Sequence, residues 1–277
     1  MTKISLVTGA SRGLGRNTAL HLAEKGNDVI VTYHSSGDAA QAMVAQVEAM
    51  GRKALAFQLD SGDVAAFAPF ADRLRMALRE TWGRETFDHL VNNAGHGAYA
   101  SIAQTSEAQF DALVNVHFKG VFFLTQALLP PSEAQFDALV NVHFKGVFFL
   151  TQALLPLIAD GGRIVNISSG LTRMSLPGYA AYAAAKGAVE VLTRYMAKEW
   201  GARGIAVNTV APGAIETDFG GGVVRDNPQI NRDLADVTAL GRVGLPDDIG
   251  RMISSLLADD NQWVNAQRIE VSGGQGL

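Results

Sequence analysis

The sequence of 277 residues contains no cysteine. That absence excludes disulfide bonds and thiolate-bound metals, but it leaves the cellular compartment open, because secreted proteins can also lack cysteine. The six histidines show no metal-ligand spacing, so no metal site is expected. An excess of positive charge is missing as well. The formal net charge is −4, and phosphate contacts need clustered Lys and Arg, so no nucleic-acid partner is expected.

Long hydrophobic runs are also missing. The best candidate, residues 147–159, is interrupted by Thr151 and Gln152, whereas a membrane-spanning helix needs roughly 18 or more apolar residues. Met1 to Lys3 lead straight into a β-branched segment and a glycine-rich turn, which leaves no room for the apolar region of a signal peptide. We therefore expect a cytoplasmic protein without a membrane partner.

Apolar, β-branched segments alternate with helical patterns along the whole chain. The predicted strands are residues 4–8, 29–33, 54–59, 89–92, 163–168, 206–210 and 268–271, and predicted helices include 14–25, 39–50 and 64–80. Continuous apolar strands separated by amphipathic helices are typical of a parallel sheet covered on both faces. The sequence therefore predicts an α/β fold, with residues 1–277 forming a single doubly wound Rossmann-type domain. Its parallel sheet would have about seven strands, with helices on both faces.

One segment is duplicated. Residues 106–130 and 132–156 both read SEAQFDALVNVHFKGVFFLTQALLP, with Pro131 at the junction. A repeat architecture needs at least three units, which drift in sequence, so two identical copies do not indicate a solenoid. Either a recent duplication of the DNA or an error in assembling the sequence explains the identity. Without one 26-residue period the chain would have 251 residues.

A glycine-rich loop, TGASRGLG, occupies residues 8–15, directly after the first predicted strand. Gly9 permits a sharp turn, Gly13 lets the backbone approach a pyrophosphate, and Gly15 lets helix and strand pack closely. The following helix would present its N–H groups and positive dipole end to the phosphates. The alternative is a turn without a ligand, but the position after the first strand favours a dinucleotide site.

The residues after the second predicted strand indicate which dinucleotide binds. An NAD enzyme usually carries Asp or Glu there to hold the ribose 2′-hydroxyl. This chain has Tyr-His-Ser-Ser at 33–36 and no acid until Asp38. Arg12 in the glycine loop and Ser35 offer donors to a 2′-phosphate, which Arg can bind with two hydrogen bonds. NADP(H) is therefore the predicted cofactor, and the alternative is that Arg12 is a solvated cation of the loop.

Four further motifs follow in order. Residues 92–95 read NNAG, Ser169 precedes YAAAK at 182–186 by thirteen residues, 212–217 read PGAIET, and 271–274 read VSGG. With the glycine loop they resemble, over nearly the whole chain, the short-chain dehydrogenase/reductase family, whose motifs are TGxxxGxG, NNAG, Ser with YxxxK, PGxxxT and VDGG. Ser272 departs from the last pattern, in which the family has Asp. The general likeness is to the branch of 3-oxoacyl-thioester reductases.

The resemblance implies a role for each matching position. The catalytic residues would be Asn141, Ser169, Tyr182 and Lys186. Residues expected to bind the cofactor are Gly9, Ser11, Arg12, Gly13, Leu14, Gly15, Ser35, Asp60, Asn92, Ala94, Gly95, Tyr182, Lys186, Pro212, Gly213, Ile215 and Thr217. Asp60 would meet the adenine, and Ile215 and Thr217 the carboxamide. The resemblance also implies a small carbonyl or alcohol substrate and a homo-oligomer, a dimer or a tetramer.

Chemistry supports the implied pair of Tyr182 and Lys186. The two residues are four apart, so on a helix they lie on one face. A phenol with its ordinary pKa near 10 is a poor base at neutral pH. A neighbouring ammonium and the positive charge of oxidised nicotinamide favour the phenolate, which brings the pKa toward the range useful for acid–base catalysis. Ser169 would donate a hydrogen bond to the substrate oxygen, and Lys186 would also hold the nicotinamide ribose.

The duplication offers two positions for the family's catalytic asparagine. Asn115 follows Asn93 by 22 residues and Asn141 precedes Ser169 by 28, and both separations fit the family. We favour Asn141, because a helix feeding a strand separates it from Ser169, whereas the loop before the first copy tolerates insertions. The displaced copy is apolar almost all round. It is therefore expected to find another apolar partner, to become disordered or to promote association.

The expected function is that of an NADP(H)-dependent oxidoreductase that interconverts a carbonyl and a secondary alcohol, with Tyr182 as general acid and base. The alternative is an NADP(H)-binding protein with impaired or absent turnover, because the duplicated helix disturbs the active site or the oligomer. Residues 217–237, which include three consecutive glycines, form the candidate lid. The identity of the substrate is not encoded in these motifs.

Overall fold

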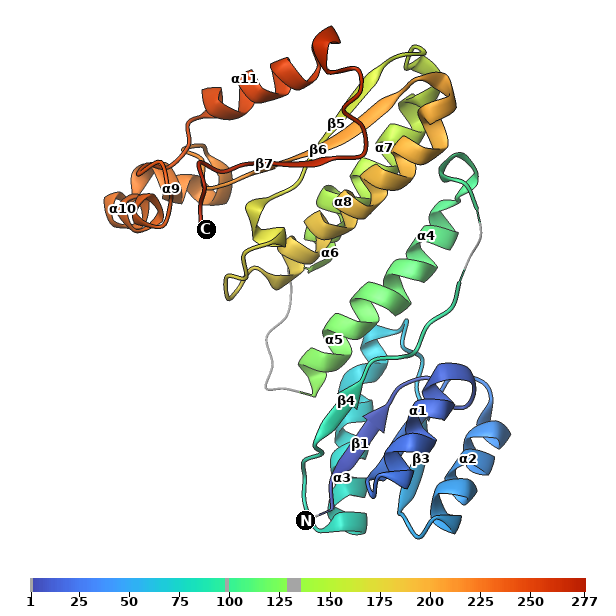
Figure 1. The fold of residues 1–277 in the computed structure, drawn as a ribbon. Coiled ribbons are helices and arrows are strands. Elements are labelled where there is room, and N and C mark those ends of the chain that lie inside the picture. Colours follow the sequence, from blue (N-terminus) through green and yellow to red (C-terminus); the bar gives the residue numbers. More distant parts are fainter. Residues whose placement is uncertain (1, 98–99, 129–135) are drawn as a thin grey trace. The chain divides into compact units, whose positions relative to one another are not determined.

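The computed structural model describes residues 2–97, 100–128 and 136–277. The predicted junction of the two copies at Pro131 lies outside them. The chain forms two compact units, one of Met1–Ala100 with Thr105–Ser132 and one of Ser101–Gln104 with Glu133–Leu277 (Figure 1). Each unit carries its own parallel sheet. That residues 1–277 form one domain stays a prediction.

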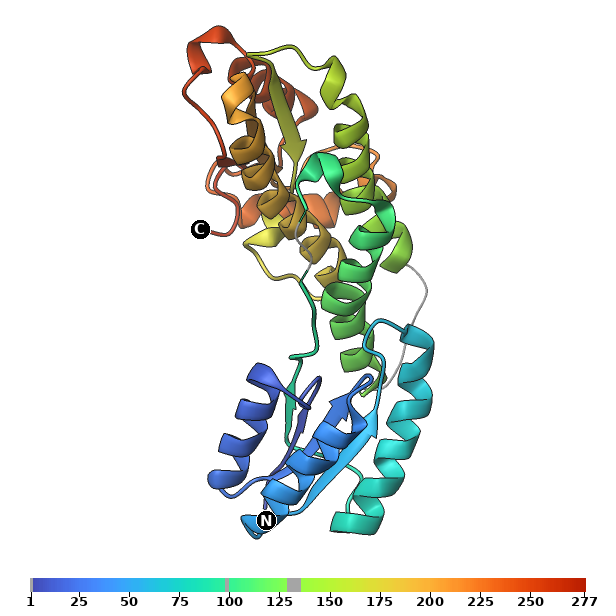
Figure 2. The ribbon, with the colours of Figure 1, turned by 90° about the vertical axis from the view of Figure 1, so that its right-hand side faces the viewer.

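The N-terminal unit has a four-stranded sheet in the order β3-β2-β1-β4 (Figure 2). Side chains alternate between the two faces of β1, so Val7 packs with α1 and α2, while Ile4 and Leu6 pack with α3 and α5. The strands are β1 Ile4–Val7, β2 Asp28–Tyr33, β3 Ala54–Gln58 and β4 His89–Val91. The helices are α1 Gly13–Glu24, α2 Gly37–Ala49, α3 Phe67–Trp82, α4 Glu107–Val114 and α5 Gly120–Ala127, with a π-helical turn at Asn115–Lys119.

The C-terminal unit has a three-stranded sheet in the order β5-β6-β7. Helix α8 lies on one face with α6 and α7, and α11 lies on the other (Figure 1). The strands are β5 Arg163–Ile167, β6 Ala206–Pro212 and β7 Arg268–Val271. The helices are α6 Phe136–Val140, α7 Gly146–Leu154, α8 Ala180–Trp200, α9 Val223–Asp226, α10 Pro228–Asp236 and α11 Pro246–Leu256, with a π-helical turn at Asn141–Lys145.

The predicted fold class is confirmed. Seven parallel strands alternate with helices, and each strand begins and ends within two residues of its predicted bounds. One predicted helix, 64–80, is divided: Val64–Ala66 form a 3-10 turn, which the Asp63 carboxylate caps by accepting the Ala65 N–H at 3.0 Å, and α3 starts at Phe67. No helix in the described part of the chain has the length and apolar character needed to cross a membrane.

The two copies of the duplicated segment bury different faces. In the first copy Leu124 is 1% exposed and belongs to the core of the N-terminal unit. Gly120 lies so close to the Ser61 carbonyl that a Cβ there would clash. The equivalents in the second copy, Leu150 and Gly146, are exposed, Leu150 by 62%.

The second copy instead packs on α8 of its own unit, with Phe136, Val140 and Phe148 buried. Of the three outcomes expected for a displaced copy, an apolar partner is therefore the one found: each copy has a core to cover. The apolar surface that runs nearly all round the segment makes this possible, because either side can be buried.

Candidate active site

The glycine loop is a close-packed turn at the carboxyl end of β1. Gly9 and Gly13 have φ of +62° and +57°, values that favour glycine. A Cβ at Gly9 would lie 2.8 Å from the Ala94 Cα, and one at Gly15 would lie 2.7 Å from the Gly9 carbonyl oxygen. The loop leads into the N-terminus of α1, whose N–H groups suit an anion. These features fit the pyrophosphate of a dinucleotide.

Hydrogen bonds join this loop to the residues after β4. The Thr8 hydroxyl oxygen accepts the N–H groups of Asn93 and Ala94, both at 2.9 Å. The Asn93 amide donates to the Thr8 carbonyl at 2.8 Å. Asn93 was not among the predicted site residues, although the NNAG motif contains it, and here it holds the loop rather than facing a ligand site.

The ends of β2 and β3 bring further predicted residues to the same edge of the sheet. The Asp60 carboxylate accepts the Gly62 N–H at 2.8 Å and lies 3.6 Å from the His34 imidazole. Arg12 and Ser35 are exposed. His34 is a neighbour of Asp60 that the sequence did not reveal, because only the sheet register brings β2 and β3 side by side.

The remaining predicted catalytic groups lie in the C-terminal unit, around α8. The Lys186 Nζ is 5.8 Å from the centre of the Tyr182 ring and donates to the Ile167 carbonyl at 3.0 Å. Burial lowers the pKa of Lys186. Burial also raises the pKa of Tyr182 above its ordinary value, and a hydrogen bond with Ser169 opposes that shift. The lowering expected for Tyr182 is thus not found, because burial outweighs the hydrogen bond.

Two aromatic neighbours of Tyr182 went unpredicted. The His143 ring meets the Tyr182 ring edge-on at 5.1 Å, and the Phe219 ring lies 5.6 Å from it. Burial, and then the charge of Lys186, lower the pKa of His143 and favour its neutral form. Phe219 opens the candidate lid, which folds into short helices after Gly220, Gly221 and Gly222, all with positive φ. Neither ring belongs to a motif, so only the packing reveals them.

The segment after β6 is held against the C-terminus. The Gln275 side-chain oxygen accepts the Ala214 N–H at 2.9 Å, and a Cβ at Gly213 would lie 2.8 Å from that oxygen. Ile215 forms a β-bridge with Gly244. The Thr217 hydroxyl accepts the Phe219 N–H at 3.2 Å, which links this segment to the start of the lid.

The predicted site residues thus fall into two sets. The N-terminal unit holds Gly9, Ser11, Arg12, Gly13, Leu14, Gly15, Ser35, Asp60, Asn92, Ala94 and Gly95. The C-terminal unit holds Asn141, Ser169, Tyr182, Lys186, Pro212, Gly213, Ile215 and Thr217. Within residues 2–97, 100–128 and 136–277 there is no group of three His, Asp or Glu side chains that could hold a metal ion.

Two family models match the chain. One described as "short chain dehydrogenase" matches residues 3–135, and one described as "Enoyl-(Acyl carrier protein) reductase" matches residues 131–275. The two matches meet at the junction of the duplicated segment, so each includes one copy.

Curated relatives match over nearly their whole length. The hydroxynaphthalene reductase-like protein Arp2 of Metarhizium brunneum is 33% identical, over 98% of this chain and 94% of that protein. Versicolorin reductase 1 of Aspergillus parasiticus is also 33% identical, over 98% and 95%. Among solved structures, the angucycline C-6 ketoreductase LanV with bound NADP is 31% identical over 99% of this chain and 95% of that one, with a TM-score of 0.45.

Proposed function

The chain belongs to the short-chain dehydrogenase/reductase family, and from that we propose that it is an NADP(H)-dependent oxidoreductase interconverting a carbonyl and a secondary alcohol, with Tyr182 as general acid and base. The observation that carries the proposal is the arrangement around α8. Tyr182 and Lys186 share one helix face, and Ser169 hydrogen-bonds the phenol.

In the reducing direction Tyr182 would donate a proton to the substrate oxygen. Its raised pKa keeps the phenol protonated at neutral pH, which suits a proton donor. Ser169 would hold the same oxygen by a hydrogen bond. Lys186, fixed by the Ile167 carbonyl, would place its charge beside the ring and hold the ribose. The cofactor supplies the hydride when bound.

The N-terminal unit would bind the cofactor through backbone N–H groups of the glycine loop and α1. Arg12 and Ser35, both exposed at the ends of β1 and β2, would hold the 2′-phosphate. Asp60 would meet the adenine. The absence of an acid at 33–36 removes the repulsion that a carboxylate would exert on that phosphate.

Replacement of Arg12 by Ala tests the cofactor preference. The change should weaken NADPH binding about ten- to a hundredfold, the worth of a charge-assisted hydrogen bond, and leave NADH nearly unaffected. Fluorescence titration with each nucleotide measures both affinities. Arg16→Ala is the matched control, because this α1 arginine is bonded to Gln46 at 2.7 Å. Equal losses for both nucleotides in Arg12→Ala would rule out the assignment.

We also propose that the second copy supplies the catalytic asparagine. Asn141 stands at the start of the π-helical turn that places His143 against Tyr182, whereas Asn115 stands in the N-terminal unit beside Gly62. Asn141→Ala should lower kcat by about tenfold or more, as expected when a positioning group in an active site is lost. Asn115→Ala, identical in sequence context, should leave kcat nearly unchanged. Steady-state kinetics of the two variants decide, and the reverse pattern would assign the role to the first copy.

The alternative function is NADP(H) binding without turnover. NADPH oxidation measured with a panel of ketones separates the two, because a binding protein would show affinity and no rate. The panel should include 2-tetralone, since the relatives' names point to fused aromatic ketones, and an acetoacetyl thioester for the thioester reductase branch. Location in the cytoplasm and assembly as a homo-oligomer stay predictions.

A further inference from the structure

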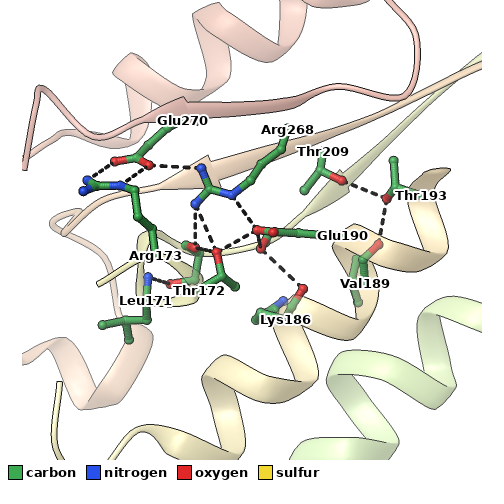
Figure 3. Close-up of polar contacts among 12 residues, drawn as sticks. Leu171, Thr172, Arg173, Lys186, Val189, Glu190, Thr193, Thr209, Arg268 and Glu270 are labelled. Atoms are coloured by element: carbon green, nitrogen blue, oxygen red, sulfur yellow. Dashed lines mark hydrogen bonds and ion pairs between the residues drawn. The ribbon is translucent and has the colours of Figure 1, made fainter. Parts of the chain in front are cut away.

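A buried carboxylate lies one helical turn beyond Lys186. Glu190 follows Lys186 by four residues, so Tyr182, Lys186 and Glu190 lie along one face of α8. The Glu190 side chain is only 14% exposed. Its Oε1 atom is 2.6 Å from the Ser168 hydroxyl, 2.7 Å from the Thr172 hydroxyl and 2.7 Å from the Arg268 Nε (Figure 3).

Those partners surround the proposed catalytic serine. Ser168 precedes Ser169, and the Thr172 hydroxyl is 2.9 Å from the Ser169 carbonyl oxygen. Arg268, on β7, donates to the Thr172 hydroxyl at 3.0 Å and approaches the Ser169 carbonyl at 3.4 Å. A single carboxylate oxygen thus ties the segment that carries Ser169 to the helix that carries Tyr182 and Lys186.

Arg268 is itself held from the other side. Its Nη1 donates to the Glu270 carboxylate at 3.0 Å, and that carboxylate receives two hydrogen bonds from Arg173, at 2.6 and 2.8 Å (Figure 3). The pKa of Glu270 falls to about 2, chiefly because of the bond from Arg173. Arg173 also donates to the Gln275 carbonyl at 2.7 Å, and Gln275 holds the segment after β6. The guanidinium of Arg268 therefore has a rigid setting between two carboxylates.

We propose that Glu190 and Arg268 are positioning residues for the reaction: they set the placement of Ser169 relative to Tyr182 and Lys186 without touching the substrate. This inference rests on the proposed function. Small displacements of reacting groups can cost about a hundredfold in rate. An ion pair at this depth is held by its hydrogen bonds, and truncation of one partner leaves a buried charge and two hydroxyls without their acceptor.

Three variants test the placement. Glu190→Ala removes the acceptor of all three bonds and should lower kcat by at least about tenfold. Glu190→Gln keeps an oxygen at the position of Oε1, so it should retain kcat within about threefold of the parent. Arg268→Lys cannot contact Glu190, Thr172 and Glu270 together and should lower kcat to an intermediate value. Asp259→Asn, in an exposed pair with Arg163, is the control and should match the parent.

The measurement is kcat per cofactor-binding site for the full-length chain, with 2-tetralone or the acetoacetyl thioester as substrate. NADPH titration counts the binding sites, so loss of folded protein alone does not lower this value, and rescue by Gln distinguishes placement from charge. Parental kcat per site in Glu190→Ala, or in Arg268→Lys if the former does not fold, overturns the inference alone. Equal losses in Glu190→Gln and Glu190→Ala also overturn it. A parent that binds NADPH without turnover overturns the proposed function together with the inference.

Discussion

Replacement of Tyr182 by Phe should abolish nearly all turnover and leave NADPH binding almost intact. The change removes the hydroxyl that would donate the proton but keeps the ring, which packs against His143 and Phe219. Acid–base catalysis by a positioned side chain is worth about 10²–10⁴-fold, so kcat should fall by about that factor. NADPH oxidation in the presence of a ketone measures the rate, and fluorescence titration measures the affinity for NADPH.

Tyr195→Phe is the matched control for this experiment. Tyr195 also lies on α8 but is 62% exposed, so loss of its hydroxyl should not change the rate. Retention of more than about a tenth of kcat in Tyr182→Phe would contradict the proposed proton donor, because it falls below the range of acid–base effects.

Leu124→Ala should destabilise the protein far more than Leu150→Ala, although the two leucines occupy the same position in identical segments. Leu124 is buried in a core with Phe67 and Phe70, and truncation of a buried leucine costs about 2–5 kcal/mol. Leu150 is exposed, and surface substitutions usually stay within about 0.5 kcal/mol. Urea unfolding followed by tryptophan fluorescence compares the two, since Trp82 packs on the same core as Leu124.

Each variant serves as the control for the other, because the local helix propensity changes equally in both. A similar loss of stability in the two variants would mean that both leucines are buried, contrary to the structure. A larger loss in Leu150→Ala would mean that the second copy, not the first, supplies the covered leucine.

The sequence was sufficient for features that depend on neighbours along the chain. The alternation of apolar strands and helices predicted all seven strands. The glycines of residues 8–15 predicted a turn that only a residue without a Cβ can form, as the positive φ of Gly9 shows. The spacing of Tyr182 and Lys186 placed both on one face of α8 because a helix repeats every 3.6 residues.

The duplicated segment separates local from tertiary effects most clearly. Both copies form a π-helical turn in which a glycine N–H bonds to the asparagine carbonyl five residues earlier, Gly120 to Asn115 and Gly146 to Asn141. Identical local sequence thus gives identical backbone structure in two different units. The sequence could not decide which face of each copy is buried, because both faces are apolar.

Burial and long-range partners were decided only by the tertiary structure. The raised pKa of Tyr182 comes from the groups that cover it, and the spacing of Tyr182 and Lys186 alone predicted the opposite direction. Glu190 and Arg268 are 78 residues apart and belong to no motif, so only the pairing of β6 with β7 and the packing of α8 on β6 bring them together. Hydrogen bonds within a helix or turn depend on residues a few positions away, whereas burial and charge pairing depend on residues that the fold alone makes neighbours.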